Sequence, residues 1–256
     1  MFKNELFVFP SWKNQFKGLK CGFTLPPMGN QALTRKSISS GKSTIENRYG
    51  LADFLSINLE NIFCPYQIHS DIIITVNKEK IGMGSYSLEN TIEGDACITK
   101  EKNVLLLITW ADCVPIIFFD PVTGWMGAIH SGWKSTVKNI AGKTIDLFVK
   151  NGVDPSNIYA AIGPGVRDCC YSVGDEVKKQ FTDCGLTAFF REKSDKIYFD
   201  LSGAVYQQLL NNGLKKAKID FCGKCTCCSV YPSFFSFRKD GQDFEAQAAC
   251  IGRFQN

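Results

Sequence analysis

The sequence lacks an export signal and any apolar run long enough to cross a membrane. Its first fifteen residues, MFKNELFVFPSWKNQ, place a glutamate soon after an early lysine, and the apolar run from Leu6 to Phe9 is short. A secretory signal has a basic start and an apolar stretch of about 7–15 residues, and a membrane helix needs about 20. We therefore predict a cytoplasmic protein without a membrane partner.

The sequence also has little excess charge. The formal net charge is +4 over 256 residues, and the lysines are spread along the chain rather than gathered in one stretch. Binding to a nucleic-acid backbone needs a basic patch or stripe. We therefore do not expect a nucleic-acid partner. The sequence leaves the oligomeric state open.

Cysteine, in contrast, is abundant, with 12 residues. Because no export signal accompanies them, we predict free thiols rather than a disulfide framework. The run Cys222-Gly-Lys-Cys225-Thr-Cys227-Cys228 contains a CxxC spacing typical of structural zinc sites. However, no second CxxC or histidine pair follows to complete four ligands. Seven further cysteines are expected to be small buried apolar residues: Cys21, Cys64, Cys97, Cys169, Cys170, Cys184 and Cys250.

Histidine is scarce, and one of the two histidines lies in the most distinctive stretch of the chain. Apolar runs at 104–109, 114–119 and 125–130 predict buried strands. If Phe119 faces Trp125 across the turn at 120–124, Cys113 falls within one position of being opposite His130. Cross-strand Cβ atoms lie about 5 Å apart. This pairing suits either a metal site or a Cys/His nucleophile pair.

The second histidine, His69, supplies the remaining nitrogen donor. One cysteine and two histidines would fill a catalytic zinc site and leave its fourth position open. Each histidine is equally well explained as a hydrogen-bonded, partly buried polar residue. The residue spacing of the predicted hairpin does not by itself place His69 near Cys113 and His130.

The pattern along the chain predicts an α+β fold: a single domain over residues 1–256 with mixed β-sheets flanked by helices. Strands are expected to outnumber helices and to run in both directions. Further strands are predicted at 72–76, 96–99, 158–162, 196–199, 234–238 and 246–251, and helices at 134–150, 174–182 and 202–211.

Seven motifs in order along the chain resemble the laccase-domain family, also called the multicopper polyphenol oxidase family. They span nearly the whole sequence, and their combination is highly specific. The motifs are Gln67-Ile-His69, Glu93-Gly-Asp95-Ala-Cys-Ile-Thr99, Thr109-Trp-Ala-Asp112-Cys113-Val-Pro115, His130-Ser-Gly-Trp133-Lys134, Ile162-Gly-Pro164, Cys169-Cys-Tyr-Ser-Val-Gly174 and Phe234-Phe-Ser-Phe-Arg238.

The resemblance implies one metal ion, zinc with copper as the alternative, held by the residues matching His69, Cys113 and His130. It also implies an enzyme acting on purine nucleosides and phosphate: phosphorolysis of adenosine, inosine, guanosine and methylthioadenosine, together with deamination of adenosine. Phenol oxidation is at most secondary. A multicopper oxidase needs about ten copper ligands, mostly histidine, and this chain has two histidines.

Phosphorolysis requires cationic groups to balance the charge of phosphate. The candidates are Lys134, Arg48, Arg167 and Arg238. The backbone N–H groups of Gly163-Pro-Gly165, which follow a predicted strand, are a candidate anion site, although Gly-Pro also simply makes a turn. Asp112, next to Cys113, is a candidate acid/base or partner of a ligating histidine. As a strand neighbour of a ligand it would point to the opposite face, an objection that does not apply to Asp95.

Two alternatives remain open. Cys113 and His130 could act without metal as a cysteine hydrolase or amidase, including one that edits peptidoglycan precursors. Alternatively, the chain is a non-catalytic metal-binding partner protein. Metal content separates the first alternative from the zinc enzyme, and nucleoside turnover separates the second.

Overall fold

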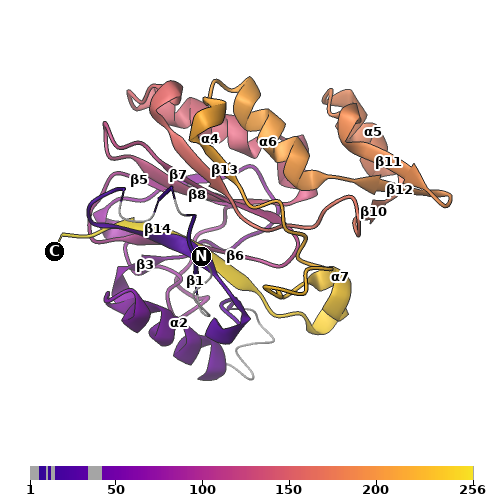
Figure 1. The fold of residues 1–256 in the computed structure, drawn as a ribbon. Coiled ribbons are helices and arrows are strands. Elements are labelled where there is room, and N and C mark those ends of the chain that lie inside the picture. The colour runs from indigo at the N-terminus through magenta and orange to yellow at the C-terminus, as the bar shows by residue number, and fades with distance from the viewer. Residues whose placement is uncertain (1–5, 10, 13–14, 34–41, 256) are drawn as a thin grey trace.

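The central apolar runs form β6 (Leu105–Trp110) and β7 (Val114–Phe119). In the computed structural model, which describes residues 6–9, 11–12, 15–33 and 42–255, these strands belong to two different large sheets (Figure 1). Side chains alternate between the two faces of a strand, and nearly every residue of β6 and β7 is buried. Because both faces are covered, each strand reads as a continuous apolar run.

Both large sheets are mixed, since parallel pairs occur beside antiparallel ones. In spatial order the first contains β1 (Leu6–Phe7), β2 (Leu19–Thr24), β14 (Gln247–Arg253), β6 and β3 (Ile62–Phe63). The second contains β13 (Ile219–Phe221), β9 (Tyr159–Ile162), β7, β8 (Met126–Ser131), β5 (Ala96–Thr99) and β4 (Ile73–Thr75). A small antiparallel sheet contains β10 (Ser172–Val173), β12 (Lys196–Phe199) and β11 (Phe190–Lys193).

The two large sheets pack face to face, and helices cover their outer faces. Leu106 of β6 and Ile117 of β7 share the core between the sheets. Leu105 faces the opposite way into the core beneath α2 (Lys42–Phe54), and Phe118 faces the core beneath α4 (Ile140–Lys150) and α6 (Leu201–Asn211). The layers are therefore helix, sheet, sheet and helices, with α5 (Asp175–Asp183) and the small sheet to one side (Figure 1).

The predicted α+β class with mixed sheets is confirmed. The organisation of residues 1–256 as one domain stays a prediction. No helix in the described part of the chain combines the length and apolar character that a membrane span requires.

The helix predicted at 134–150 is wrong in one respect, because the structure divides it into α3 (Trp133–Val137) and α4. Asn139 lies between them in the left-handed conformation, with φ 56°, and its side-chain oxygen accepts a hydrogen bond from Gly142 N. Asparagine tolerates this backbone region and is a favourable N-cap. The chain therefore turns at Asn139 and starts a new helix.

The strand predicted at 234–238 is also wrong. Residues before β14 form a loop and the short helix α7 (Phe237–Asp240), which Ser236 caps through a hydrogen bond from Lys239 N. Buried Gln247 holds this loop, since its side-chain amide donates to the carbonyl of Phe235. The strand predicted at 246–251 is confirmed as part of β14.

The central hairpin is confirmed with a register one residue from the predicted one. Phe119 pairs with Met126 rather than Trp125, and His130 pairs with Pro115. Asp120 forms the turn, since its carboxylate accepts hydrogen bonds from Val122 N at 3.0 Å and Thr123 N at 3.1 Å. Cys113 still ends within two residues of the position opposite His130.

Candidate metal centre and substrate cavity

The candidate site lies at the edge where the chain crosses from one large sheet to the other. β6 ends at Trp110, a turn carries Asp112 and Cys113, and β7 begins at Val114 in the second sheet. His130 is near the end of the neighbouring strand β8, directly opposite Pro115. The thiol and this imidazole are therefore positioned by adjacent strands of one sheet.

Asp95 fixes the orientation of His130 from the other side. The β5–β8 register puts Ala96 opposite Ile129, so Asp95 faces His130, and His130 N donates to the Asp95 carbonyl at 2.8 Å. The His130 Nδ1–H donates to Asp95 Oδ1 at 2.9 Å. Because a carboxylate only accepts, Nδ1 carries the proton of this bond, and Nε2 is the nitrogen left to interact with Cys113. Carboxylate partners of this kind orient metal-binding histidines.

The same carboxylate also holds the segment that carries His69. Asp95 accepts hydrogen bonds from His69 N at 3.0 Å, Ile68 N at 3.3 Å and Ser70 N at 2.5 Å, and from the Ser70 hydroxyl at 2.7 Å. His69 adopts φ 58°, a strained backbone for a residue with a side chain. Asp95 therefore stabilises a tight turn that directs His69 toward the other two residues.

A second anchor joins the His69 segment to the first sheet. The Gln67 side chain donates to the Thr109 carbonyl at 2.7 Å and accepts from Thr109 N at 2.7 Å. This pair of bonds continues the backbone pairing of β6 onto the loop. The loop before β4 is thus tied to both sheets, two residues away from His69.

The three side chains converge on a common point. The potential ligand atoms of His69, Cys113 and His130 all lie within 4.8 Å of one another, and His69 Nε2 lies 3.8 Å from Cys113 Sγ. The approach depends on Gly132, because a Cβ there would lie 2.8 Å from His69 Cδ2 and 3.0 Å from Cys113 Sγ. Two imidazoles and a thiol are suitable ligands for zinc or copper, so the group fits a metal cofactor.

Electrostatics favour the ligating form of Cys113. Burial alone would raise the pKa of the thiol, but His130 and His69 outweigh burial and lower this pKa to about 6. Burial would lower the pKa of His130, but Cys113 and Asp95 raise it to about 10. Burial would likewise raise the pKa of Asp95, yet the hydrogen bond and charge of His130 hold it below its ordinary value. A thiolate is the form of cysteine that binds metal.

The three residues lie in the wall of a cavity of about 790 Å³. This volume is within the range of sites for small organic ligands. Much of the wall is aromatic, and the rings of Tyr66, Phe237 and Phe244 are exposed to solvent. The aromatic lining residues are Tyr66, Trp110, Trp133, Tyr171, Phe237 and Phe244.

Among the residues that the structure describes, three cationic side chains line the cavity. Lys134 is exposed, with Nζ 5.6 Å from the centre of the Trp133 ring. Arg238 lies over the Tyr171 ring at 4.9 Å and donates to the Ser172 carbonyl at 3.0 Å. Arg48 is buried, at 1% exposure. These positions place positive charge around the space beside the metal centre.

Arg48 is bound to neutral groups. It donates to the carbonyls of Gln31 at 2.9 Å, Gly84 at 2.5 Å and Ser85 at 2.7 Å, and its Nη2 lies 3.4 Å from Cys64 Sγ. Burial raises the pKa of Cys64 despite the nearby guanidinium, which keeps this thiol neutral. Within the described residues, Arg48 forms no ion pair, and buried charges are ordinarily paired. An anion in the cavity would complete its environment.

Gly163, Gly165 and Arg167 are not among the residues that line the cavity, although Val166 between them is. Gly163 N donates to the Pro115 carbonyl at 2.9 Å and Gly165 N to the Lys224 carbonyl at 3.3 Å, so both N–H groups already have acceptors. Arg167 forms two hydrogen bonds to Asp200, at 3.0 and 2.6 Å. In the structure, the hydrogen bonds of these three expected substrate-binding residues go to other protein groups near the end of β9.

Asp112 is placed differently from the sequence expectation. It lies in the crossing turn with φ 79°, not within a strand. Its Oδ1 accepts from the Thr226 hydroxyl at 2.5 Å and its Oδ2 from Arg238 N at 2.7 Å. The carboxylate that partners the candidate ligand His130 is Asp95. Asp112 connects the turn to the loop of Thr226 and to the start of α7.

Tyr171 is one of the cavity residues that were not predicted from the sequence. It is buried, and it contacts Arg238. Its position in the motif Cys169-Cys-Tyr-Ser-Val-Gly174 was the available signal. The motif itself does not show that its tyrosine reaches the metal centre, because β9, β10 and their loop are placed by pairing with distant strands.

The chain is similar to several known proteins. A sequence model of the family described as multi-copper polyphenol oxidoreductase laccase matches residues 16–253. Purine nucleoside phosphorylase YlmD from Geobacillus stearothermophilus is 34% identical over 251 residues, covering 93% of this chain and 91% of the relative. Adenosine deaminase RL5, from an unknown prokaryotic organism, is 30% identical over 202 residues, or 77% of each chain. The crystal structure of YlmD from Geobacillus stearothermophilus is 31% identical, with a TM-score of 0.88 over 100% of this chain and 98% of that chain.

Proposed function

Because the chain belongs to the multi-copper polyphenol oxidoreductase laccase family, as its motifs predicted, we propose that it is a zinc-dependent purine nucleoside phosphorylase that also deaminates adenosine. The observation that carries the proposal is the position of the His69–Cys113–His130 group in the wall of an aromatic, cation-lined cavity. The names of the relatives from Geobacillus stearothermophilus and from the unknown prokaryote support the two activities. We place the protein in the cytoplasm.

Zinc is the metal we propose, with His69, Cys113 and His130 as its ligands. When bound, zinc supplies a Lewis acid that makes hydroxide available near neutral pH. The chain has two histidines in total, whereas a multicopper centre needs about ten copper ligands, mostly histidine. Two histidines are therefore too few for a multicopper centre.

The cavity side chains divide the binding of a nucleoside and phosphate between them. The aromatic residues at the opening offer flat apolar surfaces on which a purine can stack. In phosphorolysis, phosphate attacks the ribose C1′ and the purine leaves, so adenosine and phosphate give adenine and ribose 1-phosphate. Lys134 and Arg48 bind the phosphate oxygens in this proposal, and Arg238 adds to the local positive charge. Hydrogen bonds to charged groups contribute about 1.5–3 kcal/mol each.

Deamination uses water in place of phosphate. Adenosine and water give inosine and ammonia, and attack occurs at C6 of the adenine ring. This reaction therefore does not require the charge of Lys134. In this proposal Asp112 keeps the Cys113 turn in position through Thr226 and Arg238. The predicted substrate-binding role of Gly163, Gly165 and Arg167 stays a prediction.

The test compares the two reactions in one variant. Lys134→Met should lower kcat/KM for phosphorolysis about 10–100-fold, equivalent to about 1.5–3 kcal/mol, and leave deamination nearly unchanged. Lys138→Met is the matched control, because Lys138 is one turn further on, is half exposed and pairs with Asp71. Chromatography of adenosine incubated with and without phosphate measures both products. His69→Ala should abolish both reactions together with metal binding at the His69–Cys113–His130 site.

The result that contradicts the phosphorylase assignment is metal-loaded protein that consumes no purine nucleoside. In that case the non-catalytic metal-binding reading would replace it. Equal loss of both reactions in Lys134→Met would instead remove the specific role of Lys134 in phosphate binding. Wild-type activity in His69→Ala would exclude the metal mechanism.

A second candidate rests on the arrangement Cys113–His130–Asp95. The half-buried thiol is beside His130, and Asp95 orients that imidazole at 2.9 Å, which is the order of groups in a cysteine hydrolase or amidase. Peptidoglycan-precursor editing falls in this class. This activity would persist after chelation of the metal and would end on alkylation of Cys113, whereas the zinc enzyme would lose activity on chelation.

A further inference from the structure

A second cluster of thiols lies away from the cavity. Cys169 and Cys170 follow β9, and Cys225 and Cys228 follow β13. β9 and β13 are neighbouring parallel strands, so the chain leaves both at the same edge of the sheet. The two loops are joined there, since Gly165 N donates to the Lys224 carbonyl at 3.3 Å and Thr226 N to the Gly165 carbonyl at 3.2 Å.

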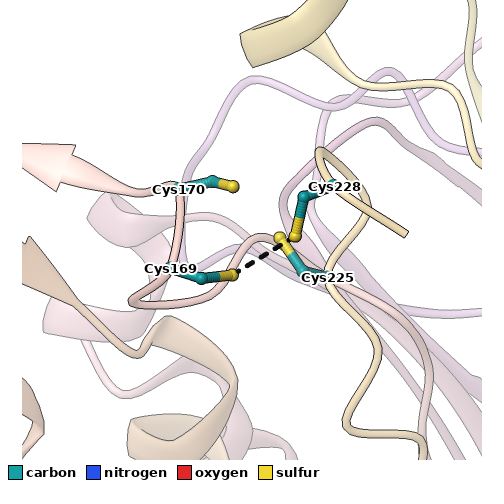
Figure 2. A group of neighbouring side chains, drawn as sticks. All are labelled: Cys169, Cys170, Cys225 and Cys228. Atoms are coloured by element: carbon teal, nitrogen blue, oxygen red, sulfur yellow. Dashed lines mark hydrogen bonds between the residues drawn. The ribbon is translucent and has the colours of Figure 1, made fainter. Parts of the chain in front are cut away.

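The four sulfur atoms are gathered as a single metal ion would require. Figure 2 shows the adjacent pair Cys169 and Cys170 facing the turn with Cys225 and Cys228. All four Sγ atoms lie within 4.8 Å of one another, and Cys169 Sγ is 3.5 Å from Cys228 Sγ. A Zn–S bond of about 2.3 Å in a tetrahedral site places sulfurs about 3.8 Å apart. An iron–sulfur cluster would separate the thiolates further, because several irons and sulfides lie between them.

We propose that Cys169, Cys170, Cys225 and Cys228 bind a second, structural zinc ion as four thiolates. Four thiols lose their protons to the solvent as the ion binds, and no oxidation is involved. A closed set of four cysteine ligands is typical of structural zinc. This site is independent of the nucleoside reaction proposed above.

The four ligands are not confined to the run Cys222–Cys228, where the sequence shows a CxxC spacing. Cys222, although spaced as CxxC with Cys225, packs toward the core between the two sheets. Cys227 packs against the core beneath α4 and α6. Cys169, expected to be a buried apolar residue, is exposed. The completing pair comes from a loop more than fifty residues earlier in the sequence, which explains why the local spacing left the site incomplete.

The turn around Cys225 directs backbone N–H groups at its sulfur. The backbone N–H groups of Arg167, Cys227 and Cys228 face Cys225 Sγ, and Ser229 N donates to the Cys225 carbonyl at 3.1 Å. Amide donors around a ligating sulfur orient the ligand and stabilise its negative charge. These contacts fix Cys225 while three less buried thiols complete the cluster.

The site would secure the wall of the cavity. Tyr171, next to Cys170, lines the cavity. Thr226, between Cys225 and Cys228, donates to Asp112, which precedes Cys113. A zinc ion that joins the two loops therefore stabilises the backbone beside Tyr171 and, through Thr226, the turn before Cys113. It does so without contacting the substrate.

The experiment uses the full chain with the first site removed by His69→Ala and Cys113→Ala. This background isolates the second site, so its outcome does not depend on the nucleoside reaction. Purified anaerobically with zinc present, it should retain one zinc per chain. Adding Cys169→Ser and Cys228→Ser should reduce zinc to near zero. Adding Cys222→Ser and Cys227→Ser instead is the matched control and should leave one zinc.

Zinc X-ray absorption provides a test that needs no change in the cluster. In the same background, the ion should show a shell of sulfur ligands only, at about 2.3 Å. The proposal would be overturned if the protein contained no zinc, if it contained iron in place of zinc, or if the zinc had both nitrogen and sulfur ligands. A mass two hydrogens lighter than the free-thiol form in anaerobic protein would also overturn it, because it would show a Cys169–Cys228 disulfide instead.

Discussion

At the scale of single residues, one carboxylate organises the candidate metal centre. Asp95 is fully buried and accepts hydrogen bonds from His130 Nδ1 and from the backbone of the His69 segment. A buried carboxylate is tolerated because its oxygens are satisfied by donors. The residue that holds both histidines is therefore not a ligand itself.

Asp95→Asn should weaken metal binding at the His69–Cys113–His130 site about 10–100-fold, the usual effect of removing the carboxylate behind a ligating histidine. The amide has one acceptor oxygen, and its NH₂ group would face the donors that Asp95 now accepts from. Competition with a chromogenic chelator measures the affinity, and thermal unfolding checks that the variant is folded.

Asp71→Asn is the matched control for this change. Asp71 lies two residues after His69 but faces outward, where it pairs with Lys138 at 3.4 Å and Lys143 at 2.5 Å. It should bind zinc as the wild type does. Unchanged affinity in folded Asp95→Asn would show that the histidines keep their orientation without the carboxylate.

At the scale of elements, the break between α3 and α4 depends on Asn139. Its left-handed backbone turns the chain, and its side chain satisfies Gly142 N at the start of α4. Asn139→Ala should lower the free energy of unfolding by about 1–2 kcal/mol, because alanine loses the cap and is strained at φ 56°.

Asn139→Gly separates these two costs. Glycine loses the same side chain but adopts positive φ without strain, so the loss should be only a few tenths of a kcal/mol. Urea unfolding of the three proteins measures the differences. Equal losses for alanine and glycine would show that the backbone conformation of Asn139 carries no cost, contrary to this account.

The elements that the sequence predicted well are those with an uninterrupted apolar signal. Strands β6 and β7 are apolar throughout because each separates two cores, and Phe119 and Met126 fix a hairpin close to the predicted one. Phe234 and Phe235 carry a similar apolar signal, yet their segment is a loop, because the Gln247 side chain occupies its backbone groups. Such a distant side-chain bond leaves no mark in the local pattern.

The residues of the candidate site also divide into those that local spacing brings together and those that depend on distant contacts. Cys113 and His130 could be brought together from hairpin spacing, whereas His69 required the family resemblance. Its approach depends on the parallel pairing of β4 with β5 and on Asp95, neither of which is local. The four-cysteine cluster depends likewise on the adjacency of β9 and β13.

At the scale of the whole molecule, Asp112 joins three segments that are far apart in the sequence. It holds the turn before Cys113, the cysteine-rich turn through Thr226, and the start of α7 through Arg238 N. Its carbonyl also accepts from Val166 N at 2.8 Å. The metal centre, the thiol cluster and the Arg238 side of the cavity are thus linked through one buried side chain.

Two roles for Asp112 make opposite predictions for Thr226→Val, which removes one donor while leaving the carboxylate. If Asp112 transferred a proton, Asp112→Asn would lower kcat about 10²–10⁴-fold, and Thr226→Val would keep nearly full activity. If Asp112 positions the Cys113 turn, Thr226→Val should lose much of the same activity. We expect the second result, since both carboxylate oxygens are engaged by fold contacts.

The double variant completes the test. Removing a hydrogen bond to a buried charged group should cost about 1.5–3 kcal/mol of unfolding free energy in Thr226→Val, and residues in direct contact couple by about 0.5–3 kcal/mol. The losses in Asp112→Asn and Thr226→Val should therefore be less than additive, both in urea unfolding and in phosphorolysis. Thr226→Ser, which keeps the hydroxyl, should restore activity and stability toward wild type. Additive losses, or full activity in Thr226→Val beside an inactive but stable Asp112→Asn, would assign Asp112 to proton transfer, because only the ionisable group itself would then matter.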